Sequence, residues 1–564
     1  MFLILVSLGF YATLDAKHLP LLLFSVVVNF LLGMRLQRAV EERKREIAAS
    51  ALPPRNDEME GLPRLSLRGF SHGNLNDEER DCRASLAVTE QWQERDCRAL
   101  RLPRRLCLLA MTRWSNDAKV LLVLAVVFNL ALLGASKYIV GFSVLSALGI
   151  SFFTFHQLAY HVDIYRGRFR ASGFLEYLLF VAFFPHMIAG PIVRPAQFMP
   201  QLAENSFKKS KIAMGVMFFS IGLFKKTVFA DGAAKIADRV FEGSAGVGFF
   251  EAWSGVLAYG MQIYFDFSGY ADMAIGVGLL FGIYLPLNFK NPYKATSMIE
   301  FWRRWHITLS DFVRDYLYIP LGGNRHGKFR QGVAILVAMT LIGVWHGSAW
   351  SFVAWGFLHG AALGVNHLFR GFFVERKREI AAPALPPRNN GVGRDDWEEK
   401  ERDCRASLAM TRGVVKAGGF VMTFTTVMLL WVLFRSESFE AAIVFYKKLF
   451  LFDKSIALFE GWWMLVLGYA VIFFGRSAAE IVGYGMDCRA CHCEASAVAI
   501  SMTEQERDCR ASLAMTESVA MTESVAMTEK KLGIMDGVLV GVVLFLAFKM
   551  MMGEPSRSFV YFVF

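Results

Sequence analysis

Two histidines are the residues in this sequence whose type and setting could do chemistry. His346 lies in the middle of the apolar stretch VAILVAMTLIGVWHGSAWSFVAWGFL, residues 333–358. An ionisable side chain at membrane depth costs about 2.5–3.5 kcal/mol on insertion scales, so it usually marks a functional site. His306 lies in EFWRRWHITLSDF, whose basic and aromatic residues are typical of a membrane boundary. Because histidine titrates near neutral pH, the chemistry to expect of a buried histidine is proton transfer.

The elements that must position these histidines are membrane helices. Of the 564 residues, 54% are hydrophobic, against about 45–50% in a soluble globular protein. Several apolar runs approach the ~20 residues that an α-helix needs to cross a hydrocarbon core. A membrane barrel would instead show short segments of alternating hydrophobicity. The sequence therefore predicts an all-α, polytopic membrane protein.

The chain is also basic, with a formal net charge of +11. Much of this charge flanks the hydrophobic runs, which indicates membrane orientation and not a groove that follows nucleic-acid phosphates. We therefore expect membrane lipid, and no nucleic acid, among the partners. The basic clusters that we assign to one cytoplasmic face are Arg35 and Arg38; Arg166, Arg168 and Arg170; Lys208, Lys209 and Lys211; and Arg325, Lys328 and Arg330.

Three polar islands interrupt the hydrophobic pattern, at 41–116, 374–413 and 486–531. The segment ERKREIAASALPPRN (42–56) recurs with one difference at 375–389, and RDCRASLA occurs three times. A structural repeat recurs at a fixed period and stacks hydrophobic faces, whereas these repeats are charged and irregularly spaced. We predict disordered insertions of translated repetitive DNA in cytoplasmic loops. The alternative is a dedicated cytosolic binding module.

All eight cysteines lie in these islands, so the remaining chain has no disulfide framework. The motif CRACHC (488–493) looks like a metal-binding cluster, because thiolates and imidazole are zinc ligands. Its neighbours are repeat sequence with no ordered scaffold, however. We therefore predict no metal site in this protein.

The islands divide the chain into membrane-embedded parts. These parts are 1–40, with a first helix that looks truncated; the core 117–373; further helices at 414–485; and a last helix and tail at 532–564. The predicted spans are 18–34, 118–137, 142–163, 210–229, 250–268, 271–287, 331–346, 349–369, 415–434, 461–475 and 532–549. Two further apolar stretches, 173–193 and 297–321, contain proline, glycine and charge. Such residues predict broken or re-entrant helices that are buried in protein or line a cavity.

Several motifs carry a family resemblance. They include FFPHMIAGPIVRPAQFMPQL (183–202), YFDFSGYADMAIG (264–276), LPLNFKNPY (285–293), FWRRWHITLSDFVRDYLYIPLGGNR (301–325) and VWHGSAWSFVAWGFLHG (344–360). With these motifs the chain resembles the membrane-bound O-acyltransferase (MBOAT) family, specifically the bacterial branch that contains the alginate O-acetyltransferase membrane subunit.

The resemblance implies a bundle of about eleven transmembrane helices plus two re-entrant segments around a central tunnel. It also implies transfer of an acyl group from a cytosolic donor through the membrane to an acceptor on the outer side. The donor would be acetyl-CoA or another acyl thioester, with no permanently bound cofactor. Expected partners are an extracytoplasmic acetyltransferase and a polysaccharide, and the expected location is the bacterial inner membrane.

The resemblance also suggests roles for the two histidines. His346 matches the catalytic histidine of the family's WHG motif, and His306 matches the second motif histidine in FWRRWH. Acyl transfer to a hydroxyl needs a base that removes the hydroxyl proton as attack begins, and we assign this role to His346. A covalent acyl-histidine is a less favoured alternative.

Four charged residues are candidates for supporting roles. Arg303 and Arg304 could, with His306, polarise the thioester carbonyl or bind donor phosphates; the alternative is an interfacial helix anchored in lipid headgroups. Asp266 and Asp272 could orient a histidine, pair with an arginine, or form a structural ion pair. Tryptophans expected to shape a tunnel or interface are Trp302, Trp305, Trp345, Trp350 and Trp355. Histidines without an assigned catalytic role are His156, His161, His186 and His359.

The leading hypothesis is an O-acetyltransferase. It would act on an alginate-like extracytoplasmic polysaccharide or hand the acetyl group to a partner transferase. D-alanyl transfer and peptidoglycan acyl transfer are alternatives within the same chemistry. Alternatives of another class are a transporter without chemistry, although no internal repeat typical of transporters is visible, and an inactive product of repeat insertion.

Overall fold

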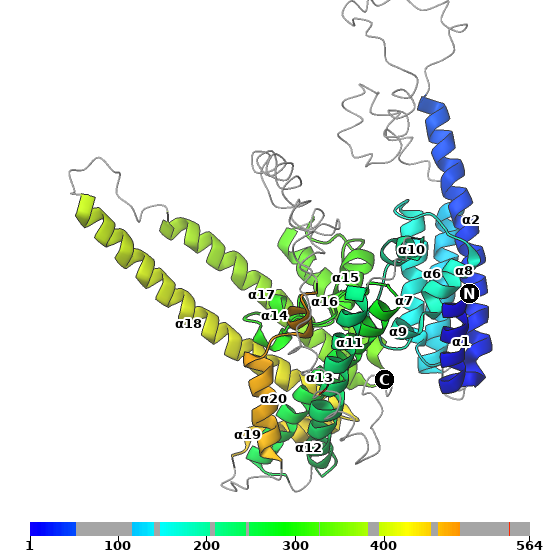
Figure 1. Cartoon of the computed structure of the whole chain (residues 1–564). Coiled ribbons are helices and arrows are strands. Elements are labelled where there is room, and N and C mark those ends of the chain that lie inside the picture. The colour runs from blue at the N-terminus through cyan, green and yellow to red at the C-terminus, as the bar shows by residue number, and fades with distance from the viewer. Residues whose placement is uncertain are drawn as a thin grey trace, which may run out of the picture. The chain divides into compact units, whose positions relative to one another are not determined.

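The structure is a computed structural model that describes residues 1–51, 116–139, 147–203, 209–243, 247–325, 327–381, 394–452, 461–484 and 541. Every regular element in these ranges is helical (Figure 1), which confirms the predicted all-α class. The predicted span 532–549, apart from residue 541, and CRACHC lie outside the described residues. Where the islands are described, residues 41–51, 374–381 and 394–413 continue helices, and the island boundaries stay a prediction.

The helices of the described residues follow one another along the chain. In order they are α1 (Phe2–Asp15), η1 (Ala16–His18), α2 (Leu19–Ala51), α6 (Asn116–Tyr138), α7 (Ile150–Tyr165), α8 (Phe174–Ala182), α9 (Phe184–Met187), α10 (Pro195–Ala203), α11 (Lys209–Phe224), the π-helix η4 (Lys225–Ala230), α12 (Asp231–Glu242), α13 (Phe249–Leu280), η6 (Pro292–Lys294), α14 (Met298–Trp302), α15 (Ile307–Val313), the π-helix η7 (Arg314–Tyr318), α16 (Gly327–His346), α17 (Trp350–Ala381), α18 (Arg394–Arg435), α19 (Phe439–Phe450), α20 (Trp462–Phe474) and α21 (Ala478–Val482).

Six helical stretches of the described residues are long and apolar enough to cross a membrane. They are Phe2–Arg45, Asp117–Tyr138, Ser210–Glu242, Gly327–His346, Trp350–Arg370 and Val415–Arg435. These stretches agree with the prediction of a polytopic membrane protein. The predicted number of about eleven spans is not confirmed by this part of the chain.

The chain divides into two compact units. The smaller unit comprises Val27–Phe128 and Tyr160–Ala171, and the larger comprises Met1–Val26, Asn129–Ala159 and Ser172–Phe564. Both candidate histidines belong to the larger unit. The site can therefore be described within that unit alone.

Helix α13 corrects one part of the sequence prediction. The stretches 250–268 and 271–287 were expected to be two spans, but Phe249–Leu280 is one continuous helix. Gly282 lies just past its end, and its positive φ of 77° suits a residue without a Cβ. The amide of Ile283 donates to the Gly278 carbonyl at 2.8 Å, and that of Gly282 to the Leu279 carbonyl at 2.9 Å. This pair of bonds is a Schellman C-cap, which sets the end of the helix.

Helix α13 is largely buried, and glycines bring it against α11. A Cβ on Gly269 would lie 2.7 Å from the Gly222 carbonyl oxygen, and a Cβ on Gly276 would lie 2.6 Å from that of Gly215. Small residues let helix backbones approach closely in membrane proteins. The contact also aligns η4, which continues α11, with the acidic side chains of α13.

Helices α16 and α17 form the hairpin that carries His346 (Figure 1). A Cβ on Gly343 would lie 2.3 Å from the Phe352 carbonyl oxygen, and a Cβ on Gly356 would lie 2.4 Å from that of Met339. His346 is the last residue of α16, one turn after Gly343. The tight backbone contact therefore lies directly beside the candidate base.

The two interrupted apolar stretches are broken helices, as predicted. Residues 173–193 contain α8 and the four-residue α9, with Pro185 in its first turn. Residues 297–321 contain α14, α15 and η7, separated at His306 by a left-handed backbone conformation. Whether either stretch is re-entrant in a bilayer stays a prediction.

The hairpin contact yields a stability prediction. Substitution Gly356→Ala should lower the free energy of unfolding by about 1–3 kcal/mol, because the new methyl group overpacks the contact with α16. Gly364→Ala is the matched control in the same helix, since a Cβ there meets nothing within 4 Å. It should leave stability equal or raise it by up to about 1 kcal/mol through helix propensity. Thermal unfolding in detergent measures both, and equal melting temperatures for the two variants would contradict the contact.

Candidate active site

The structure brings His346 and His306 together in one narrow pocket. His346 is 4% exposed and His306 is 1% exposed. The pocket is lined by Trp302, Trp305, His306, Leu309, His346, Trp355, Trp431 and Phe434. The histidines supply the imidazole groups of this lining, and the rest is largely aromatic. Residues from α14, α15, α16, α17 and α18 thus meet around two imidazoles.

His346 is held by aromatic rings from three helices. Its ring lies edge-on to Trp355 of α17 at a centroid distance of 5.3 Å and to Phe434 of α18 at 4.8 Å. The ring of Trp345 packs against it in a tilted arrangement, with a centroid distance of 4.5 Å. Edge-to-face packing of this kind is favourable and directional, so the imidazole has few orientations open to it.

His306 lies at a strained backbone position. Its φ of 43° and ψ of 55° are left-handed, and it is the N-cap residue of α15. Such a conformation costs a residue with a side chain about 1–3 kcal/mol and persists only where its surroundings enforce it. The backbone amide of the next residue, Ile307, donates to the Asn288 carbonyl at 2.9 Å. The loop that follows α13 therefore holds His306 in place.

Asn288 also determines which ring nitrogen of His306 carries hydrogen. Its Oδ1 accepts from the backbone amide of Thr308 at 3.3 Å and from the Thr308 hydroxyl at 2.9 Å. Because a backbone amide can only donate, this side-chain atom is the oxygen. His306 Nδ1 lies 3.0 Å from the same atom and must donate to it. The neutral ring then carries its lone pair on Nε2.

Sequence reasoning missed Asn288. The available signal was an amide within the otherwise apolar run LPLNF, which begins the motif at 285–293. Asn288 is 1% exposed, and a buried amide needs hydrogen-bond partners. The partner was not visible, because His306 lies on a different helical segment.

The two arginines do not line the pocket. Arg304 pairs with Glu300 of α14 at 2.5 Å, with both side chains about one-third exposed. Arg303 is exposed at the end of the same short helix. The predicted role of Arg303 and Arg304, to polarise the thioester carbonyl with His306 or to bind donor phosphates, stays a prediction.

The two aspartates form structural ion pairs, one of the three interpretations left open by the sequence. Asp266 lies 2.8 Å from Lys226 and Asp272 lies 2.5 Å from Lys225. Lys226 also lies 2.8 Å from Asp231. Neither Asp266 nor Asp272 lines the histidine pocket. Both lysines come from η4, which the sequence pattern did not single out as the partner element.

The tryptophans divide into two groups. Trp302, Trp305 and Trp355 line the pocket, as expected, while Trp350 is 77% exposed. Trp302 Nε1 donates to Nδ1 of His359 at 3.3 Å. His359 thus orients a wall of the pocket without lining it.

Comparison with known proteins identifies the family. The family model described as MBOAT, membrane-bound O-acyltransferase family, matches residues 108–377. The peptidoglycan O-acetyltransferase of Helicobacter pylori is 38% identical over 365 residues, which cover 57% of this chain and 63% of that protein. The probable alginate O-acetylase AlgI of Pseudomonas aeruginosa is 36% identical over 386 residues, covering 63% and 66%. Residues 108–377 of this chain are a membrane-bound O-acyltransferase family domain.

More distant relatives in this family carry another name. The teichoic acid D-alanyltransferase of Streptococcus thermophilus is 29% identical over 306 residues, which cover 52% of this chain and 69% of that protein. The chain spans 63%, 64% and 66% of the length of three O-acetylating relatives. The family match includes both pocket histidines.

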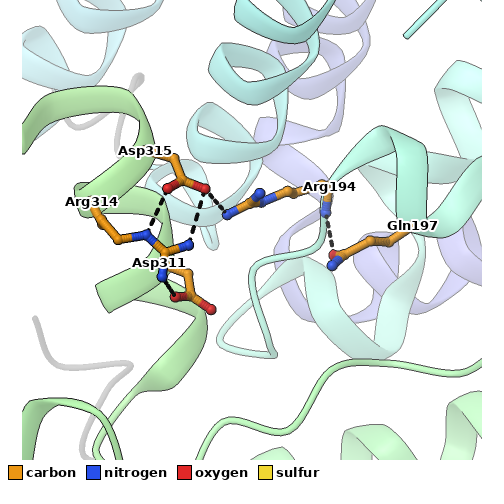
Figure 2. A network of polar contacts seen from close by, with 5 residues as sticks. All are labelled: Arg194, Gln197, Asp311, Arg314 and Asp315. Carbon is orange, nitrogen blue, oxygen red and sulfur yellow. Dashed lines mark hydrogen bonds and ion pairs between the residues drawn. The ribbon is translucent and has the colours of Figure 1, made fainter. Parts of the chain in front are cut away.

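A charged network joins the two broken segments of this MBOAT protein (Figure 2). Arg194, which follows α9, donates to Asp315 of η7. Arg314 donates to Asp315 at 2.7 Å and pairs with Asp311 at 2.9 Å. Burial raises the pKa of the Asp315 carboxyl, but the hydrogen bond from Arg314 and the charge of Arg194 outweigh it, so the net pKa lies below the ordinary value. The network therefore favours the charged carboxylate.

The network predicts energetic coupling between the two segments. In a double-mutant cycle, Arg194→Met and Asp315→Asn should couple by about 1–3 kcal/mol in unfolding free energy. The exposed Arg304–Glu300 pair is the control and should couple by about 0.3–0.5 kcal/mol. Since the pKa of Asp315 is lower in the folded protein than in the unfolded chain, its ion pairs should contribute fully to the free energy of unfolding above about pH 4. This contribution should be lost as the pH falls further. Coupling no larger than that of the control would contradict the bridge.

Proposed function

We propose that this protein is a membrane-embedded O-acyltransferase. It moves an acetyl group from a cytosolic thioester, acetyl-CoA or a related donor, to an extracytoplasmic hydroxyl of an alginate-like polysaccharide or to a partner transferase. The observation that carries the proposal is the meeting of His346 and His306 in one buried aromatic pocket. Family membership supports acyl transfer over transport without chemistry.

The reaction needs one proton to move twice. His346 takes the proton of the acceptor hydroxyl as its oxygen attacks the thioester carbonyl carbon. The tetrahedral intermediate then collapses, the carbon–sulfur bond breaks, and the departing thiolate takes the proton from His346. The ester and the free thiol are the products, and the histidine returns to its neutral form. A covalent acyl-histidine would need two such transfers.

His306 is proposed to assist as a second proton acceptor. Its Nδ1–H is engaged with Asn288, so the lone pair of the neutral ring is on Nε2. This tautomer suits a proton relay or a second base better than polarisation of a carbonyl oxygen, which needs a donor. Arg303, which is exposed, is proposed to meet a donor phosphate, while Arg304 would first have to leave Glu300.

Sequence similarity favours an acetyl group. Relatives named as O-acetylating enzymes are 36–38% identical to this chain, against 29% for a teichoic acid D-alanyltransferase. An alginate-like acceptor and a peptidoglycan acceptor are both supported by such relatives. We further propose an inner-membrane location, with an extracytoplasmic acetyltransferase as partner and the repeat islands on the cytoplasmic side.

The decisive experiment follows label from donor to product. Membranes that carry the full chain are supplied with acetyl-labelled acetyl-CoA, and transfer to polysaccharide or to a partner enzyme is measured. His346→Ala should lower transfer by about 100-fold or more, because general base catalysis contributes about 10²–10⁴. Transfer that survives His346→Ala would overturn the base assignment. A version without the islands should keep wild-type activity, and loss on deletion would show that they are more than insertions.

Asn288 gives a second prediction for the same assay. Asn288→Leu should lower kcat by about 10-fold or more, because the Nδ1–H of His306 loses its acceptor and the ring its orientation. Asn288→Asp should retain more activity, since a carboxylate also accepts from Nδ1. The control is Asn366→Leu, which removes an amide that bonds the Ile299 backbone at 3.2 Å. Equal kcat for the Asn288→Leu and Asn366→Leu variants would contradict a role in orienting His306.

A further inference from the structure

The end of α16 needs hydrogen-bond donors from elsewhere. Because the helix stops at His346, its last backbone carbonyls have no partner within the helix. Two side chains of α6 serve two of these carbonyls. Lys137 Nζ donates to the Trp345 oxygen at 2.5 Å, and the Tyr138 hydroxyl donates to the Val344 oxygen. The helix end that carries the candidate base is thus fixed by neighbouring residues 208 and 206 positions away in sequence.

Lys137 contacts the side chain of Trp345 as well as its backbone. Its ammonium nitrogen lies 5.3 Å from the centroid of the Trp345 ring, within the range of a cation–π interaction. That ring lies 4.5 Å from the ring of His346 and 5.1 Å from that of Phe155. Lys137 and Phe155 thus contact the same Trp345 ring against which His346 packs.

The charge of Lys137 is used differently from that of the two lysines of η4. Lys225 and Lys226 face carboxylates at 2.5 and 2.8 Å. Within the described part of the chain, Lys137 forms no ion pair with a carboxylate, and its ammonium faces the negative end of the α16 dipole. Even a half-buried cation without a carboxylate is costly. Its position therefore points to a task at the end of α16 rather than to charge neutralisation.

We propose that Lys137 is a positioning residue for the acyl transfer assigned to this pocket. It holds the C-terminal turn of α16 and the Trp345 ring, and these set the orientation of His346. The inference rests on the proposed function, and it adds a residue outside every motif that indicated the family. Lys137 acts through Trp345 and does not itself contact the reacting groups.

The test compares variants of the full chain in reconstituted membranes, with kcat and KM for acetyl-CoA expressed per folded protein. Lys137→Met should lower kcat by about 10- to 100-fold, because a displaced catalytic group loses about this much. KM should stay within about twofold, since a residue that only orients His346 leaves donor binding unchanged. Lys137→Arg, which keeps a charged donor, should restore kcat to within about fivefold of wild type. Lys119→Met, an exposed position on the same helix, should match wild type.

Several outcomes would overturn the proposal. One is a Lys137→Met variant with wild-type kcat; another is a rise in KM with unchanged kcat, which would indicate donor binding instead of positioning. If the methionine variant does not fold, Lys137→Gln provides a shorter, uncharged side chain, and wild-type kcat in that variant also overturns the role. A wild-type chain that transfers no acetyl group contradicts the proposed function itself, whereas active wild type with unaffected lysine variants contradicts only the role of Lys137.

Discussion

Backbone polar groups away from water need partners, and this requirement governs the site more than any other. A helix interrupted at membrane depth exposes amides and carbonyls that lipid cannot satisfy. The segment that carries His306 is interrupted in this way, and Asn288 supplies its acceptors through both its side chain and its backbone. At the end of α16, beside His346, the groups that need partners are backbone carbonyls, and Lys137 and Tyr138 supply the donors. Each candidate catalytic histidine is thus placed by the groups that satisfy a helix end.

Buried charge serves a different purpose in this protein. The carboxylates of α13 could have oriented a histidine, paired with an arginine or formed structural ion pairs, and the last is what they do, with the lysines of η4. Removing one member of such a buried pair leaves an uncompensated charge and costs about 3–5 kcal/mol. The pairs therefore specify how η4 docks on α13, together with the glycine contacts between α11 and α13. The candidate catalytic histidines lie in a largely aromatic pocket. The ion pairs between η4 and α13 lie outside that pocket in the same unit.

The sequence predicted what depends on local pattern. Apolar length indicated the helices, and proline, glycine and charge within 173–193 and 297–321 indicated broken ones. A histidine within an apolar run was enough to mark His346. The continuity of α13 was missed because Gly269 looks like a helix breaker in sequence, whereas in the structure its missing side chain is what lets α11 approach. Asn288 and Lys137 were missed because their partners are distant in sequence, and no local periodicity reports such a contact.

The π-helices explain how consecutive residues reach separate partners. In η4 the amide of Asp231 donates to the carbonyl of Lys226, a span of five residues in place of four. This wider turn changes the angular spacing of side chains relative to an α-helix. Lys225 and Lys226 are neighbours, yet they pair with Asp272 and Asp266, nearly two turns apart on α13.

The same device recurs in η7. There the amide of Ile319 donates to the carbonyl of Arg314 at 2.9 Å. The carboxylate of Asp315 accepts hydrogen bonds from Arg314 of its own helix and from Arg194, which lies between α9 and α10 (Figure 2). In both places an extra residue in the turn coincides with a charge that must meet a partner on another segment. The wide turns are therefore part of how this fold satisfies buried charge, in the same way that Asn288 and Lys137 satisfy its interrupted backbone.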